Sequence, residues 1–301
     1  MKNPIISLNG VFPPIPTPFD THGEVDHGAL TANLERWNAY ELAGYVVAGS
    51  NGEAAFLTVE EKQRVWETAR RAIPAGKLLI AGTGCESTRQ TIALTRLAAG
   101  AGADAALVLT PHYYGPMISS ENRLHHFEMV ADASPIPILL YTVPKFTHVD
   151  LDAATVARAS QHPNIVGIKD SSGNLIKMAD TIGLAGRGFQ VLAGSGGFFL
   201  AGLAIGAVGC VPALGNVAPQ EVIDIQRLFE AQRMDDAAEL QRRVIPVNTA
   251  VTARFGIPGL KAALDMLGYY GGPVRSPLAD LGDDDRHVLR DILIAGGLLR
   301  Q

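Results

Sequence analysis

The 301-residue sequence has few cysteines, few aromatic residues and no long uninterrupted apolar run. Only Cys85 and Cys210 are present, and two isolated cysteines without metal-type spacing indicate a reducing compartment without a disulfide framework. The longest apolar candidate, 198–214, is cut repeatedly by glycine, so we expect no membrane contact. Residues 1–10 lack a charged segment followed by an apolar one. We therefore expect no secretory signal and a cytoplasmic protein.

The sequence also lacks the signatures of several ligand classes. A net charge of −5 without a basic stripe argues against nucleic acid as a partner. Glycine clusters at 81–84, 194–197 and 206–209 have neither dinucleotide-fingerprint nor P-loop spacing. No His, Cys, Asp or Glu residues recur with metal-ligand spacing, and no Gly-x-Ser-x-Gly elbow follows an apolar run. We therefore expect no cofactor and no metal.

What is present is a repeated alternation of short apolar runs and amphipathic segments, in a chain that is 47% hydrophobic. We expect strands near 11–16, 45–48, 78–81, 105–109, 137–141, 165–168, 190–193 and 207–211. We expect helices near 27–40, 59–72, 87–100, 120–132, 152–160, 174–183, 197–204 and 219–231. Eight such units predict a (β/α)₈ barrel, and a doubly wound sheet is the rival, although no linker divides the chain.

Three more helices are expected after the last unit, near 234–247, 258–267 and 283–298. We divide the chain into a catalytic barrel over residues 1–232 and a C-terminal helical extension over 233–301. The extension needs a surface to pack on, which would be the barrel's side, its mouth or a subunit contact.

Two expected strands end in reactive side chains. The run 165–168 closes on Lys169, and the run 137–140 closes on Tyr141. If these strands are neighbours in a parallel sheet, both side chains open onto the same edge. Loss of hydration favours the neutral form of a lysine amine, which is the nucleophile of Schiff-base chemistry. The pair therefore predicts attack by Lys169 on a carbonyl, with Tyr141 as the proton carrier.

A short glycine-bracketed loop, Gly49-Ser50-Asn51-Gly52-Glu53, follows the second expected strand. Its backbone N–H groups, with the Ser50 hydroxyl and the Asn51 amide, suit a carboxylate. A tight turn before a helix is the alternative interpretation. Together with the lysine, the loop predicts a binding site for a 2-keto acid.

These motifs resemble a known superfamily. Gly49–Glu53, Tyr141-x-Val143-Pro144 and Gly167–Ser171 are similar, in order and spacing, to the motifs of the dihydrodipicolinate synthase / N-acetylneuraminate lyase superfamily of pyruvate-dependent class I aldolases. The resemblance implies a (β/α)₈ barrel with C-terminal helices, a homotetramer, and pyruvate and an aldehyde as reactants.

The resemblance also implies roles for individual residues. Lys169 resembles the Schiff-base lysine, and Tyr141 resembles the tyrosine that shuttles protons. Ser50 and Asn51, with the adjoining Gly52, match the loop that holds the pyruvate carboxylate, and Ser50 also relays protons. Two further positions are implied: Tyr113, which would reach into a neighbouring subunit's site, and Val211, which would line the pyruvate pocket.

Specificity within the superfamily is set elsewhere. Phe146 stands where the synthase branch typically has an arginine, which argues against dihydrodipicolinate synthesis. The Ser50-Asn51 pair is instead similar to the 4-hydroxy-2-oxoglutarate aldolases. Further segments similar to those aldolases are 160–167, 189–195, 255–261 and 268–273. Phe146 and His148 depart from the aldolase pattern, which has small residues there.

We therefore expect cleavage of 4-hydroxy-2-oxoglutarate to pyruvate and glyoxylate. The alternatives are a dehydratase or aldolase of a 3-deoxy-2-keto sugar acid, a synthase-like activity, and a keto-acid-binding regulator without catalysis.

Overall fold

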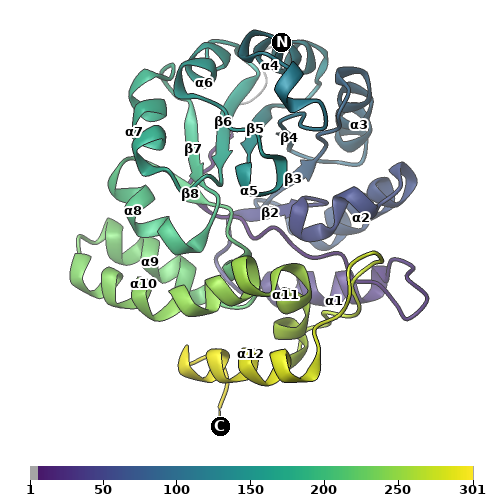
Figure 1. Cartoon of the computed structure of the whole chain (residues 1–301), viewed down its shortest axis with the longest axis vertical. Coiled ribbons are helices and arrows are strands. Elements are labelled where there is room, and N and C mark those ends of the chain that lie inside the picture. The colour runs from purple at the N-terminus through teal and green to yellow at the C-terminus, as the bar shows by residue number, and fades with distance from the viewer. Residues whose placement is uncertain (1–5, 301) are drawn as a thin grey trace.

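Parallel strands form a closed ring inside a layer of helices (Figure 1). The computed structural model describes residues 6–300; residue 301 and residues 1–5, which belong to the segment expected to lack a secretory signal, lie outside it. The strands are β1 (Gly10–Val11), β2 (Gly44–Val47), β3 (Leu78–Gly82), β4 (Ala105–Leu109), β5 (Ile138–Thr142), β6 (Ile165–Asp170), β7 (Gln190–Ala193) and β8 (Gly209–Cys210). From β2 to β8 each strand pairs with the next in parallel, and β1 pairs with β8. The predicted (β/α)₈ barrel is confirmed.

The barrel closes between β1 and β2 through an irregular segment. We expected a strand over 11–16, but β1 ends at Val11, because prolines 13, 14 and 16 have no N–H to donate to a ladder. Closure is nevertheless made: the Ile15 N–H donates to the Val46 carbonyl at 3.0 Å, and the Val46 N–H donates to the Pro13 carbonyl at 3.0 Å.

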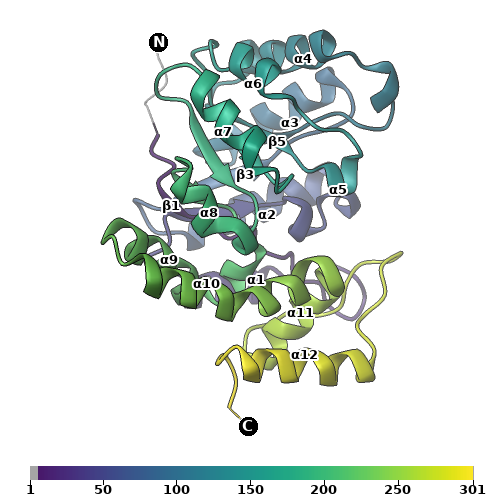
Figure 2. The ribbon, with the colours of Figure 1, turned by 60° about the vertical axis from the view of Figure 1, so that its left-hand side comes forward.

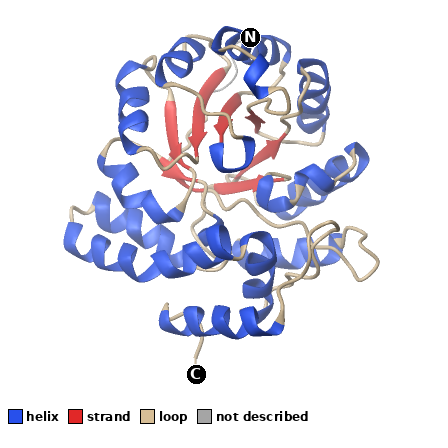
Figure 3. Ribbon diagram, viewed as in Figure 1, coloured by secondary structure: helices blue, strands red, loops and turns tan. Residues whose placement is uncertain are grey.

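Helices follow the strands along the chain, and most of them cover the outside of the ring (Figure 3). They are α1 (His27–Trp37), α2 (Val59–Ala72), α3 (Thr88–Gly100), α4 (Ser120–Ala133), α5 (Pro144–Thr147), α6 (Ala153–Ala159), α7 (Leu175–Leu184), α8 (Phe199–Ala204) and α9 (Pro219–Glu230). Six of them begin after a side chain that accepts a backbone N–H of the first turn: Asp26, Thr58, Ser87, Ser119, Asp152 and Asn174. The short α5 was not predicted, and it lies in front of the ring of strands (Figure 1).

Two apolar layers hold the barrel together. One fills the space between the strands and the surrounding helices. The other fills the barrel interior and comprises Leu8, Phe12, Val46, Ile80, Ala105, Leu107, Leu139, Tyr141, Val143, Leu192 and Val211. Tyr141 and Val211 are thus interior side chains, so the barrel is a packed core that opens only at its rim.

The chain continues into α10 (Met234–Thr249), a π-helical turn (Ala250–Arg254), α11 (Gly256–Met266) and α12 (Asp283–Ala295). These elements gather on one side of the barrel, beside α1 and α9 (Figure 2). The Asn33 side chain of α1 binds both the N–H and the carbonyl of Tyr270, and Trp37 stacks on Tyr269 with ring centroids 5.2 Å apart. The extension is therefore packed against the barrel.

Candidate functional site

Lys169 and Tyr141 lie side by side in the sheet. They are register partners on β6 and β5, and the Lys169 Nζ lies 4.1 Å from the centroid of the Tyr141 ring. We expected Lys169 to follow its strand, but β6 continues to Asp170, so the lysine belongs to the pleat and faces the interior with Tyr141. Lys169 is 4% exposed, and no carboxylate among residues 6–300 lies within ion-pair distance of its amine.

The residues that follow the pair point to the outer face of the sheet and are tied together there. The Lys177 Nζ of α7 lies 3.0 Å from Asp170 and 2.5 Å from Asp150, and Thr142 donates to Asp150 at 2.9 Å. Because Asp170 follows Lys169 and Thr142 follows Tyr141, this cluster joins the two strand ends behind Lys169 and Tyr141.

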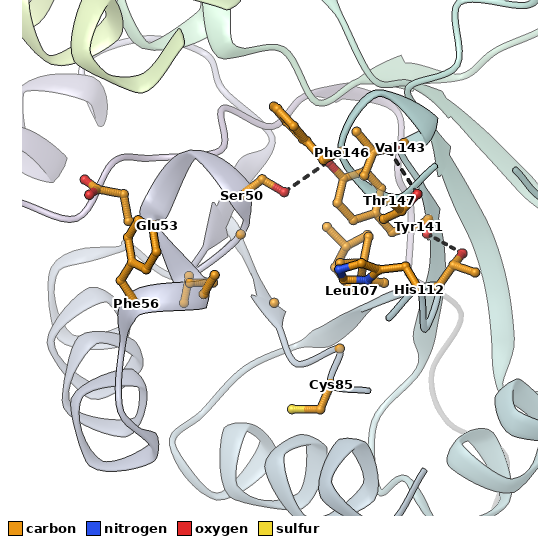
Figure 4. Close-up of a pocket in the computed structure, with 18 of the residues that line it drawn as sticks. Ser50, Glu53, Phe56, Cys85, Leu107, His112, Tyr141, Val143, Phe146 and Thr147 are labelled. Carbon is orange, nitrogen blue, oxygen red and sulfur yellow. Dashed lines mark hydrogen bonds between the residues drawn. The ribbon is translucent and has the colours of Figure 1, made fainter. Parts of the chain in front are cut away.

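The loop after β2 forms a 3₁₀ turn over Ser50–Gly52. The hydroxyls of Ser50 and Tyr141 are 3.3 Å apart and share a hydrogen bond, drawn in Figure 4. Thr17 fixes the end of the turn by donating to the Gly52 carbonyl at 2.7 Å. The predicted lysine, tyrosine and serine are therefore brought together through Tyr141.

A cavity of about 500 Å³ opens beside this group (Figure 4). Its wall near Tyr141 is mostly apolar and includes Phe146, which is 58% exposed, together with Ile257 and Leu278 from the C-terminal segment. Phe146 and the buried Thr147 belong to α5. His148 ends that helix in a left-handed conformation, is exposed and does not line the cavity. The C-terminal extension thus contributes to the mouth of the site.

The cavity also has a polar arm that the sequence did not predict. Lys62, Cys85, Glu86 and His112 line it. Burial lowers the pKa of Lys62 and raises the pKa of the Cys85 thiol, and each group's charge opposes the other's shift. A signal for Lys62 was available, because it precedes the buried residues 65, 66 and 69 of α2 at helical spacing and so faces the barrel.

Tyr113 stands apart from the other predicted residues. It is 75% exposed, in a loop whose neighbours Tyr114 and Met117 are exposed as well. Glu86 holds the loop, because its carboxylate accepts the N–H groups of His112 and Tyr113, each at 2.9 Å. Within residues 6–300 the structure shows no hydrogen bond between Tyr113 and either Ser50 or Tyr141.

The remaining predicted residues lie close to the cavity without lining it. Asn51 is half-buried in the turn, Gly52 is buried beside it, and Val211 is buried in the barrel interior. Lys169 is likewise absent from the lining, so Tyr141 is the residue that connects the lysine to the cavity.

The described part of the chain contains no cluster of three or more His, Cys, Asp or Glu side chains placed to hold a metal ion. None of its helices is both long enough and apolar enough to cross a membrane. The expectations of no cofactor and a cytoplasmic location stay predictions.

Comparison with known proteins gives consistent matches over nearly the whole chain. Residues 7–295 match the sequence profile of the Dihydrodipicolinate synthetase family. The 4-hydroxy-tetrahydrodipicolinate synthase of Methanothrix thermoacetophila is 40% identical over 95% of this chain and 96% of its own. The synthase of the same name from Oceanobacillus iheyensis is 36% identical over 92% and 93%.

Solved structures agree. The chloride-inhibited dihydrodipicolinate synthase of Acinetobacter baumannii, complexed with pyruvate, superimposes with a TM-score of 0.93 at 31% identity, over 97% of this chain and 100% of that one.

Proposed function

The chain belongs to the dihydrodipicolinate synthetase family, whose members are Schiff-base enzymes of the class I aldolase type that take pyruvate and an aldehyde, and we propose that Lys169 forms the imine in this chain. The observation that carries the proposal is the Lys169 amine, buried without an ionic partner beside the Tyr141 ring. The Tyr141 hydroxyl reaches Ser50 and the cavity from there.

The chemistry follows from these positions. The Lys169 amine attacks the C2 carbonyl of pyruvate, and the carbinolamine loses water to give the imine. Tyr141 supplies the proton to the departing hydroxyl, and its phenolate then takes the C3 proton, which gives the enamine. The enamine carbon attacks the aldehyde, Tyr141 protonates the new alkoxide, and hydrolysis releases the product. Cleavage is the same sequence in reverse.

The carboxylate of pyruvate would lie on the turn Ser50–Gly52. The Ser50 hydroxyl, the Asn51 side chain and the backbone N–H groups of Ser50 and Asn51 supply donors for one anion, whereas the Gly52 N–H is already bound to the Gly49 carbonyl. Val211 would pack against the methyl end of pyruvate from the barrel interior.

Borohydride reduction with pyruvate tests the imine. Intact-mass and peptide mass spectrometry should find one pyruvyl adduct, on the peptide that contains Lys169, and Lys169→Ala should abolish it. Pyruvate binding without an adduct would instead support a non-catalytic keto-acid-binding regulator.

For the second reactant, the synthase names of the relatives favour the synthase-like alternative over our expectation of 4-hydroxy-2-oxoglutarate cleavage. The Ser50-Asn51 pair keeps the cleavage reaction as a second candidate, and Phe146, which stands in place of the synthase arginine, counts against the synthase reaction. A panel with coupled detection of pyruvate, covering aspartate semialdehyde, 4-hydroxy-2-oxoglutarate and a 3-deoxy-2-keto sugar acid, separates the candidates by kcat/KM.

The site would be completed by a second copy of the chain in a homotetramer. Tyr113 is an exposed aromatic residue that Glu86 holds at the edge of the cavity's polar arm. In the assembly its hydroxyl would reach the Tyr141 of the partner subunit and extend the proton relay through Ser50.

Mixing two inactive variants, Tyr113→Phe and Lys169→Ala, tests this arrangement. Refolded together, they should regain partial activity, because some sites then hold both intact residues. If verified mixed oligomers show no activity, Tyr113 acts in the site of its own subunit.

A further inference from the structure

Glu53 is the residue through which the turn Ser50–Gly52 contacts the C-terminal extension. It follows the turn directly, has a left-handed backbone with φ of 54°, and is 2% exposed. A buried carboxylate needs a partner, and a non-glycine residue keeps this backbone conformation only when its surroundings hold it.

The partner comes from α11. Lys261 is 1% exposed, and its Nζ lies 2.6 Å from the Glu53 Oε1 and donates to the Pro273 carbonyl at 2.8 Å. Burial lowers the pKa of Lys261, and the Glu53 carboxylate opposes that shift. The ring of Phe19 covers the amine, with its centroid 4.3 Å away. The pair is therefore closed off from water.

The loop after α11 adds a second contact to the same carboxylate. The Arg275 N–H donates to the Glu53 Oε2 at 2.8 Å, while the Arg275 guanidinium binds Glu61 of α2. Gly271 allows this loop to pass close to α11, since a Cβ there would lie 1.9 Å from the Lys261 carbonyl oxygen. Both oxygens of Glu53 are thus held by residues that are distant in sequence.

We propose that Glu53 and Lys261 are positioning residues for pyruvate: their ion pair fixes the turn Ser50–Gly52 so that the N–H groups of Ser50 and Asn51 face the carboxylate. The inference rests on the proposed function and assigns part of the pyruvate site to the C-terminal extension. Neither residue touches pyruvate, and both act through the backbone of the turn. Loss of either partner leaves a buried charge unpaired and lets the turn move.

The test compares two carbonyl compounds that differ in the carboxylate. Pyruvate and acetaldehyde are each trapped on Lys169 with cyanoborohydride, and the half-saturating concentration is measured for wild type, Glu53→Gln, Lys261→Met and the double variant. In the single variants pyruvate should need about a tenfold higher concentration or more, the effect of losing one hydrogen bond to a charged group. Acetaldehyde should be trapped as in wild type, because it has no carboxylate.

The double variant should recover part of the pyruvate affinity, since it leaves no buried charge unpaired. Arg36→Met is the matched control. Arg36 anchors the same extension by donating to the Leu267 and Gly268 carbonyls, far from the turn, so its loss should leave pyruvate trapping unchanged.

Unchanged pyruvate affinity in the single variants, or a parallel loss for both compounds, would overturn the positioning role. Glu53→Gln is close in shape to the wild-type residue and decides the question alone if thermal denaturation shows Lys261→Met to be unfolded. If wild type forms no adduct with either compound, the proposed function fails, and the positioning role fails with it.

Discussion

Replacing Lys177 by methionine should destabilise the protein and weaken the reaction together. Lys177 is a buried lysine of α7, and its amine binds Asp170 at 3.0 Å and Asp150 at 2.5 Å. Methionine keeps most of the volume of the lysine stem but none of its charge. The change therefore removes the cation between the ends of β5 and β6 without opening a large cavity.

The cost of Lys177→Met depends on the two carboxylates that lose their ionic partner. Asp170 is 2% exposed, and within residues 6–300 its carboxylate keeps a single hydrogen bond once the lysine is gone, from the Ser172 N–H at 2.8 Å. Removing one partner of a buried ion pair costs about 3–5 kcal/mol. Asp150 is partly exposed and can return to water, so we expect about 3 kcal/mol, near the lower end of that range.

Urea denaturation followed by circular dichroism measures the loss, and pyruvate trapping on Lys169 measures its consequence for the site. Arg158→Met is the matched control, since the Arg158–Glu121 pair is exposed on both sides and its loss should leave the free energy of unfolding nearly unchanged. Adding Asp170→Asn to Lys177→Met should restore more than half of the lost stability. A loss below about 1 kcal/mol for Lys177→Met would refute the reasoning, because a buried unpaired carboxylate cannot cost so little.

Three further changes have defined outcomes. Tyr141→Phe keeps the ring but removes the proton carrier, so steady-state kcat should fall about 10²–10⁴-fold with little change in melting temperature, and undiminished turnover would contradict the role. Phe146→Arg puts a screened charge at the cavity mouth and should raise kcat/KM for a carboxylate-bearing aldehyde about fivefold over an uncharged one; equal kcat/KM would count against it. Burial lowers the pKa of His126 to about 4. The unfolded state therefore takes up the proton first as the pH falls. The free energy of unfolding should drop by on the order of 3 kcal/mol between about pH 6.5 and about pH 4. His126→Gln should flatten that dependence in denaturant titrations, whereas the exposed control His125→Gln should not.

The architecture could be predicted from sequence because each unit repeats a local pattern. Apolar runs ending in small or polar residues marked the strands, and Ser, Thr, Asp or Asn marked most helix starts. The element boundaries that were predicted wrongly also have local causes. The first strand is shorter than expected because its prolines cannot pair, and α10 was expected to end at 247 but runs through Pro246 to Thr249 into a π-helical turn. The hydrophobic periodicity of the sequence reveals neither of these two boundaries.

The candidate site likewise contains residues that could be predicted from the sequence and residues that could not. Lys169 and Tyr141 could be paired from sequence, because parallel strands bring their carboxyl ends to one edge of a sheet. Ile257 and Leu278 could not be assigned to the cavity, since they come from the extension, whose packing depends on contacts between distant segments. Glu53 was visible as a residue of the turn, but nothing in the sequence pairs it with Lys261.

The two halves of the site constrain the reaction unequally. In the proposed reaction the pyruvate half rests on strand register, whereas the acceptor half would be a wall of Phe146, Ile257 and Leu278 from separate loops and helices. Aspartate semialdehyde and glyoxylate both carry a carboxylate, and this wall offers neither of them a cation. The charge of the wall therefore cannot separate the synthase reaction from 4-hydroxy-2-oxoglutarate cleavage, although it does separate both from a sugar acid, whose far end is neutral. A cation that pairs with the carboxylate of either acceptor must therefore come from outside the wall. Lys62, in the polar arm, is the candidate within the described lining, so the response of the substrate panel to Lys62→Met shows which half of the cavity selects the acceptor.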